Sequence, residues 1–87
     1  PYAVQRGYAA GQALKLFGSV LLKAGNHDRA LALFTKSEQN WTAVKEKHQD
    51  LCFTHLHFNF ANYYMAIKDH VPAAFHYFKV VEGSPYR

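Results

Sequence analysis

The stretch AGNHDRALALF, residues 24–34, decides the fold because it holds the end of one helix and the start of another. Gly25 is the residue type that most easily adopts the left-handed conformation found just past the C-terminal end of a helix. Asn26 is a favourable N-cap, and Asp28 lies in the first turn that follows, where the helix dipole stabilises a negative charge. The stretch therefore predicts the elbow of a helical hairpin.

Apolar residues at helical spacing lie on both sides of this elbow. Before it, one apolar face predicts a helix over about residues 9–24, formed by Leu14, Phe17, Leu21 and Ala24. After it, Ala30, Leu31 and Phe34 predict a second helix that ends between residues 39 and 47. We expect the two helices to pack as an antiparallel pair.

The second half of the chain follows the same plan. Two apolar stripes, led by Phe53 and Phe58, predict a third helix that is packed between neighbours. Asp69 or His70 begins a fourth helix, which ends at Gly83. Because no segment alternates apolar and polar residues as a strand does, the predicted fold class is all-α. The predicted buried face of the fourth helix consists of Ala74, Phe75, Phe78 and Val81.

Composition limits the classes of protein to consider. Apolar residues make up 49% and aromatic residues 16% of the chain, which is enough for a packed core. No run of about 18 apolar residues occurs, so we expect no membrane span. The single cysteine, Cys52, excludes an internal disulfide and suits a reducing, intracellular compartment such as the cytoplasm. The formal net charge of +4 suits an acidic peptide, RNA or an anionic surface, although the basic residues are scattered.

A repeat relates the two halves. Ala30-x3-Phe34 recurs as Ala74-x3-Phe78, an offset of 44 residues, and each motif follows a helix and an elbow at the same internal distances. The small alanine permits the two helices of a hairpin to approach closely. The phenylalanine one turn later fills the space between them.

The pattern Leu14-x2-Phe17-Gly18-x2-Leu21, Gly25, Ala30-x3-Phe34 resembles a tetratricopeptide (TPR) repeat, and Phe58-x2-Ala61-Asn62-x2-Met65, Asp69, Ala74-x3-Phe78 resembles a second. The resemblance covers about residues 12–85. The offset of 44 residues exceeds the family's usual repeat of about 34, as in its extended-repeat members.

The resemblance implies one domain over residues 1–87, part of a longer chain, with repeat one at about 9–47 and repeat two at about 48–85. Its two antiparallel helical hairpins would stack as a TPR-like α-solenoid fragment. A four-helix bundle without repeat ancestry is the alternative.

The resemblance also implies a binding groove, because the first helix of each TPR unit lines the concave side. Polar or amphipathic side chains on rigid helices suit the carboxylates and backbone amides of a peptide. A solvated helix face is the alternative interpretation. The two-carboxylate clamp of chaperone-tail-binding TPRs is incomplete here, so that activity is not expected. The residues that the resemblance places in the groove are Gln12, Lys15, Ser19, Lys23, His55, Asn59 and Tyr63.

Metal and catalytic sites have little support. His48, Cys52 and His55 have the spacing of one helix face and could contact zinc, but a structural zinc site needs a fourth ligand. We therefore predict no metal and no cofactor. No nucleophile has a matched acid and base at an informative spacing, and no Gly-rich phosphate loop is present. No enzymatic activity is predicted.

Together these observations predict a protein–protein interaction or scaffold module of a larger complex. It would bind a protein or peptide partner with acidic groups and pack against further repeats or another subunit. The alternative is an RNA-contacting helical-repeat protein of a ribonucleoprotein. RNA binding falls steeply as salt is raised, which distinguishes the two functions.

Overall fold

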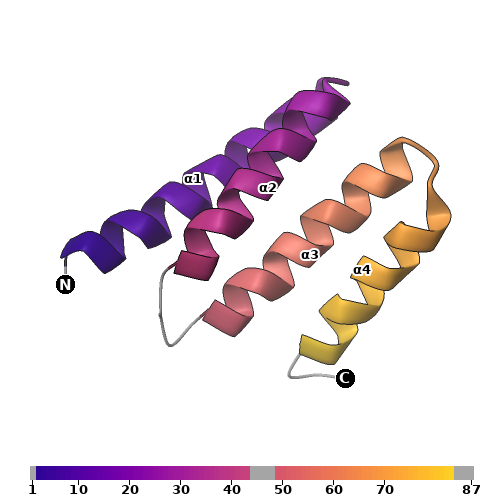
Figure 1. The fold of residues 1–87 in the computed structure, drawn as a ribbon. Coiled ribbons are helices and arrows are strands. Elements are labelled where there is room, and N and C mark those ends of the chain that lie inside the picture. The colour runs from indigo at the N-terminus through magenta and orange to yellow at the C-terminus, as the bar shows by residue number, and fades with distance from the viewer. Residues whose placement is uncertain (1, 44–48, 84–87) are drawn as a thin grey trace.

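The computed structural model describes residues 2–43 and 49–83, with side chains described for 9–42 and 53–83. Within these ranges four helices follow one another: α1 (Tyr2–Lys23), α2 (His27–Ala43), α3 (Gln49–Ala66) and α4 (His70–Gly83) (Figure 1). No strand occurs in the described ranges, and the predicted all-α fold class is confirmed. α1 begins at Tyr2 rather than near residue 9, whereas α2 and α4 begin where the sequence predicts.

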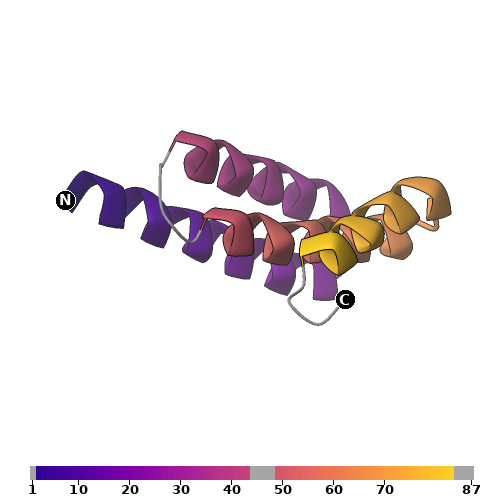
Figure 2. The same ribbon diagram turned by 90° about the horizontal axis from the view of Figure 1, so that it is seen from below.

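The helices form two antiparallel hairpins, α1–α2 and α3–α4, which pack against each other. α3 lies between the first hairpin and α4 and contacts α1, α2 and α4. Figures 1 and 2 show α4 at the edge of the molecule, where α3 is its only neighbour among the described helices. The body is thin, with Cα extents of 41 × 31 × 16 Å, so each helix keeps much of its surface outside the core.

The first elbow satisfies the last carbonyl groups of α1 with amides beyond its end. Gly25 has a φ of 88°, and its amide donates to the carbonyl oxygen of Leu22 at 3.0 Å. The Asn26 amide donates to the carbonyl oxygen of Leu21 at 2.9 Å. This pair of bonds is a Schellman motif. The Asn26 carbonyl then accepts from the Ala30 amide, as expected of an N-cap residue.

The second elbow repeats the first, bond for bond, 43 residues later. Lys68 takes the place of Gly25, with a φ of 62° and an amide that donates to Met65 at 3.1 Å. The Asp69 amide donates to the carbonyl oxygen of Tyr64 at 2.8 Å. The Asp69 carbonyl then accepts from the Ala73 amide. The same Schellman motif therefore joins the two helices within each hairpin.

The predicted offset of 44 residues is therefore wrong by one. Ala73, which is 1% exposed, takes the place of Ala30, and Tyr77 takes the place of Phe34. One residue corresponds to about 100° around a helix, so the error turns α4 by more than a quarter of a turn. The predicted buried face of α4 is consequently wrong as well, since all its members are exposed: Ala74, Phe75, Phe78 and Val81.

The core lies between the first hairpin and α3. Phe34 meets the edge of Phe60 with ring centroids 5.9 Å apart. Two glycines of α1 permit α2 to come this close: Phe34 occupies the space beside Gly18, and Trp41 occupies the space beside Gly11. The buried Ser37 hydroxyl donates to the Gly11 carbonyl oxygen at 2.7 Å. The buried core cluster consists of Ala30, Phe34, Trp41, Leu56, Phe60 and Tyr63.

Candidate partner-binding surfaces

The predicted groove residues of α1 lie on the side of the helix that faces α3. Lys15 is only 7% exposed. Gln12 and Ser19 are half-buried, and Lys23 is exposed at the end of the helix. The Ser19 hydroxyl donates to Asn59 Oδ1 at 2.8 Å, with the Lys15 carbonyl oxygen also in range at 3.1 Å. Much of this polar row is therefore used inside the molecule.

Two of the predicted groove residues of α3, Asn59 and Tyr63, lie on the side of the first hairpin. Asn59 Nδ2 donates to the His55 carbonyl oxygen at 2.9 Å, which orients the amide that Ser19 contacts. The His55 side chain is exposed. Tyr63 is 6% exposed, and burial raises the pKa of its hydroxyl, with the Asp28 carboxylate adding to the shift. The structure thus brings Ser19 and Asn59 together, buries Lys15 and Tyr63, and leaves Lys23 and His55 at the surface.

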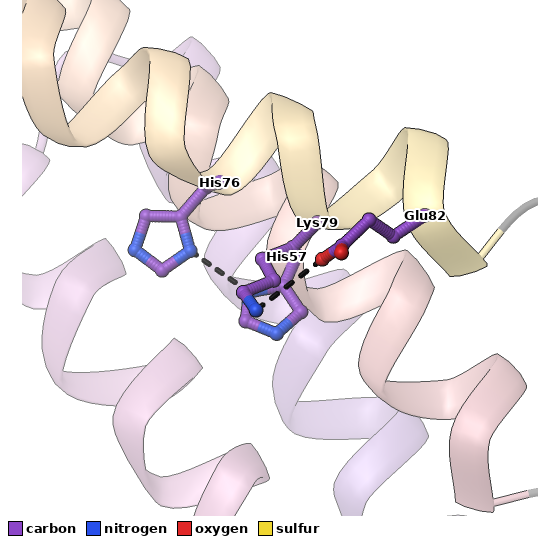
Figure 3. Close-up of polar contacts among 4 residues, drawn as sticks. All are labelled: His57, His76, Lys79 and Glu82. Carbon is purple, nitrogen blue, oxygen red and sulfur yellow. Dashed lines mark hydrogen bonds and ion pairs between the residues drawn. The ribbon is translucent and has the colours of Figure 1, made fainter.

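A histidine pair that the sequence pattern did not reveal joins α3 to α4. His57 Nδ1 lies 2.8 Å from His76 Nδ1, so one ring donates and the other accepts (Figure 3). The His76 ring stacks on Phe60 and on Tyr64, with centroids 5.3 and 5.6 Å apart. Burial lowers the pKa of both imidazoles, and for His76 the His57 charge lowers it further. The pair is therefore mainly neutral near pH 7 and serves as a packed hydrogen bond between the two helices.

Charged groups beside this pair belong mostly to α4. Lys79 Nζ lies 3.3 Å from Glu82 Oε1 on the same helix, as Figure 3 shows. The Lys79 ammonium also lies over the Phe75 ring, 5.5 Å from its centroid. This ion pair is solvent-exposed, so its contribution to stability is small.

One uncovered apolar surface, here called the α3–α4 face, spans the second hairpin. Tyr77 connects the two helices inside this face: its ring packs edge-on against Phe58, and its hydroxyl donates to Asn62 Oδ1 at 2.9 Å. The large side chains of the face are about half exposed, and no member carries a charge. Large contiguous apolar patches are rare on the surfaces of single-chain proteins, and interaction sites are one place where they occur. The α3–α4 face consists of Phe58, Met65, Ala74, Phe78 and Val81.

A second uncovered apolar surface, here called the α1 face, lies on the first helix. Its members share one side of α1 because they recur at helical spacing. Val20 is 63% exposed, and the others are exposed too, without a charge among them. The α1 face consists of Ala10, Ala13, Leu16, Phe17 and Val20.

Across the described residues no group of three or more His, Cys, Asp or Glu side chains is arranged to hold a metal ion. The side chains of His48 and Cys52, considered above as zinc ligands, lie outside the described residues. None of the four helices, as far as they are described, combines the length and the apolarity needed to cross a membrane.

Comparison with known proteins adds no relative. No family model, no curated protein and no solved structure matches the chain.

Proposed function

We propose that this chain is a protein–protein interaction module that binds a partner subunit through side chains left uncovered by its own two hairpins. The observation that carries the proposal is the α3–α4 face, where Phe58, Met65 and Phe78 are all between 46% and 59% exposed. An all-helical domain that buries Phe34 completely yet exposes these residues has apolar surface beyond what its core uses. Covering it removes that surface from water.

The energetic scale supports association with a protein rather than with a small ligand. Full burial of one large apolar side chain contributes about 1.5–3 kcal/mol, so a half-exposed one contributes roughly 1 kcal/mol when covered. The two apolar faces together offer seven such side chains, or about 7 kcal/mol. Association itself costs about 4–15 kcal/mol, so a partner must cover both faces, or one face and its surroundings.

Of the polar residues predicted to line a groove, only some remain available to a partner. Lys15 is buried, and the bond from Ser19 to Asn59 holds α1 against α3. Lys23 and His55 are the members that remain exposed for an acidic partner. Substitutions in the α3–α4 face and substitutions in the predicted polar groove should therefore affect partner binding differently.

Two sets of substitutions test the proposal by affinity capture on the immobilised chain. The first set, Phe58→Ala with Phe78→Ala, removes half-exposed rings from the α3–α4 face. The second set, Lys15→Ala, Lys23→Ala and Asn59→Ala, removes the polar row. We expect the first set to abolish capture and the second to reduce it only weakly. If both variants keep their helical circular dichroism and capture is unchanged in both, the proposal is wrong.

A specific observation, the net charge of +4, favours one second candidate, an RNA-contacting protein. It predicts binding of single-stranded RNA whose affinity falls steeply between low and moderate salt. Fluorescence anisotropy with a labelled random RNA measures this directly. Absence of binding at low salt eliminates the candidate.

A further inference from the structure

The two uncovered faces correspond, through the 43-residue repeat, to the two sides of the interface inside the molecule. Each member of the α1 face has an equivalent on α3 that packs against the first hairpin. Phe17 corresponds to Phe60 and Val20 to Tyr63, both only 6% exposed. The remaining equivalents of Ala10, Ala13 and Leu16 are Phe53 and Leu56, which pack in or against the core, and Asn59, which accepts from Ser19.

The α3–α4 face corresponds in the same way to the other side of that interface. Phe58 is 49% exposed, whereas its equivalent Lys15 is 7% exposed and lies on the side of α1 that α3 covers. Each further equivalent on the first hairpin is half-buried rather than exposed. These equivalents are Leu22 for Met65, Leu31 for Ala74, Thr35 for Phe78 and Glu38 for Val81. The second hairpin covers one side of the first hairpin. The equivalent side of the second hairpin is the α3–α4 face, which none of the described residues covers.

From this correspondence we infer that copies of the chain associate head to tail. The α1 face of one copy packs on the α3–α4 face of the next, in the way that the second hairpin packs on the first. The inference rests on the proposed interaction function and names its partner as a second copy. Continuity with the internal interface supports this occupant, because one molecule presents both halves of a contact that it already makes once.

The composition of the faces fits the same occupant. Where the first hairpin has the charged residues Lys15 and Glu38, the second has Phe58 and Val81. Neither face carries a charge, so their contact leaves no buried charge without a partner. The net charge of +4 on each copy opposes association, and salt screens that repulsion. Association should therefore be stronger at high salt, the reverse of RNA binding.

A head-to-tail contact uses two different surfaces, so it can continue from copy to copy instead of closing as a symmetric dimer. Sedimentation velocity of the purified chain over a range of concentrations tests this. We expect a sedimentation coefficient that rises with concentration. Phe17→Glu, on the α1 face, and Phe78→Glu, on the α3–α4 face, should each give a monomer at every concentration.

Mixing the two variants gives the decisive result. The Phe17→Glu variant keeps an intact α3–α4 face, and the Phe78→Glu variant keeps an intact α1 face. An equimolar mixture should therefore form a one-to-one heterodimer that does not grow further. Ala32→Glu is the matched control: Ala32 is exposed on α2 and belongs to neither face, so this variant should associate as the wild type does.

Other outcomes overturn the inference. A wild-type chain that stays monomeric at high concentration and high salt excludes self-stacking. A single variant that still dimerises indicates a symmetric contact through its intact face. The interaction function is tested apart from this: if the wild type is monomeric but captures another protein in a manner that depends on Phe58 and Phe78, the function stands and only the second copy as partner is rejected.

Discussion

Replacing Gly18 by alanine separates two opposite expectations. Helix propensity alone predicts that Gly18→Ala stabilises the protein by about 1 kcal/mol, because the position lies inside α1. The structure predicts the opposite. A Cβ at this position would lie 2.7 Å from Phe34 Cε1 and 3.3 Å from the Ala30 carbonyl oxygen.

The size of the loss in stability depends on whether the groups that contact the new methyl group can move away from it. Favourable carbon–carbon contacts lie at about 3.5–4.0 Å, so the ring and the new methyl group must separate by roughly 1 Å. Phe34 is fully buried and held against the edge of Phe60, and the neighbouring carbonyl belongs to the α2 backbone. Overpacking costs about 1–3 kcal/mol, and the upper part of that range applies where neither neighbour can reach solvent. After the gain in propensity, we expect Gly18→Ala to lower the free energy of unfolding by about 1–2 kcal/mol.

Urea denaturation of dilute protein, followed by far-ultraviolet circular dichroism, measures this change. The double variant Gly18→Ala, Phe34→Leu supplies the control, because the smaller side chain leaves room for the methyl group. The two single changes should then be less than additive, by about 1 kcal/mol or more. A stabilised Gly18→Ala variant, or strictly additive changes, would refute the close contact between α1 and α2.

Three further changes test other parts of the structure. Lys68 is held at a φ of 62°, in the left-handed conformation, which costs a residue with a side chain about 1–2 kcal/mol. Glycine avoids this cost but loses about 0.5–1 kcal/mol of conformational entropy on folding. Lys68→Gly should therefore raise the urea midpoint by the equivalent of about 0.5–1 kcal/mol. Ser37→Ala removes the buried hydrogen bond to the Gly11 carbonyl and should cost about 1–2 kcal/mol in the same assay. Burial lowers the pKa of His57 and His76 below 6.5, so the unfolded chain binds protons before the folded chain does as the pH falls. The contribution of the neutral pair to the free energy of unfolding is therefore complete above pH 6.5 and is lost as the pH drops toward the depressed pKa values. Thermal melts at pH 7.5, 6.5 and 5.5 should show this loss in the wild type and less of it in the double variant His57→Gln, His76→Gln.

The helices and the first elbow could be predicted because their signals are local. Gly25 and Asn26 are the residue types that a Schellman motif and an N-cap favour, and both stand where the structure uses them. The second elbow lacked such a signal. Lys68 adopts the left-handed conformation without being a glycine or an asparagine, so the end of α3 could be placed only to within a residue.

This uncertainty of one residue in position decided which side of α4 was expected in the core. Two adjacent alanines made Ala73 and Ala74 equally good matches to Ala30, and the large Phe78 favoured the wrong one. Apolar residues at helical spacing also identify an apolar face without showing whether the same chain buries it. Phe17 belongs to the predicted apolar face of the first helix and is 49% exposed in the structure.

The histidine pair could not be predicted for a related reason. His57 and His76 are 19 residues apart, and only the packing of α4 on α3 places their rings opposite each other. Their equivalents in the first hairpin are Leu14 and Leu33, both half-buried. A polar pair in the place of an apolar one has no signature in the spacing of either helix.

Thiol labelling tests most directly whether α4 buries its Ala73 side and leaves its Phe78 side uncovered. In a Cys52→Ser background, the variants Ala73→Cys and Ala74→Cys place one thiol on each side of the helix. At low protein concentration, we expect rapid modification of the Ala74→Cys variant and strong protection of the Ala73→Cys variant. The reverse order would place Ala74 and Phe78 in the core and would show that this orientation of α4 is wrong.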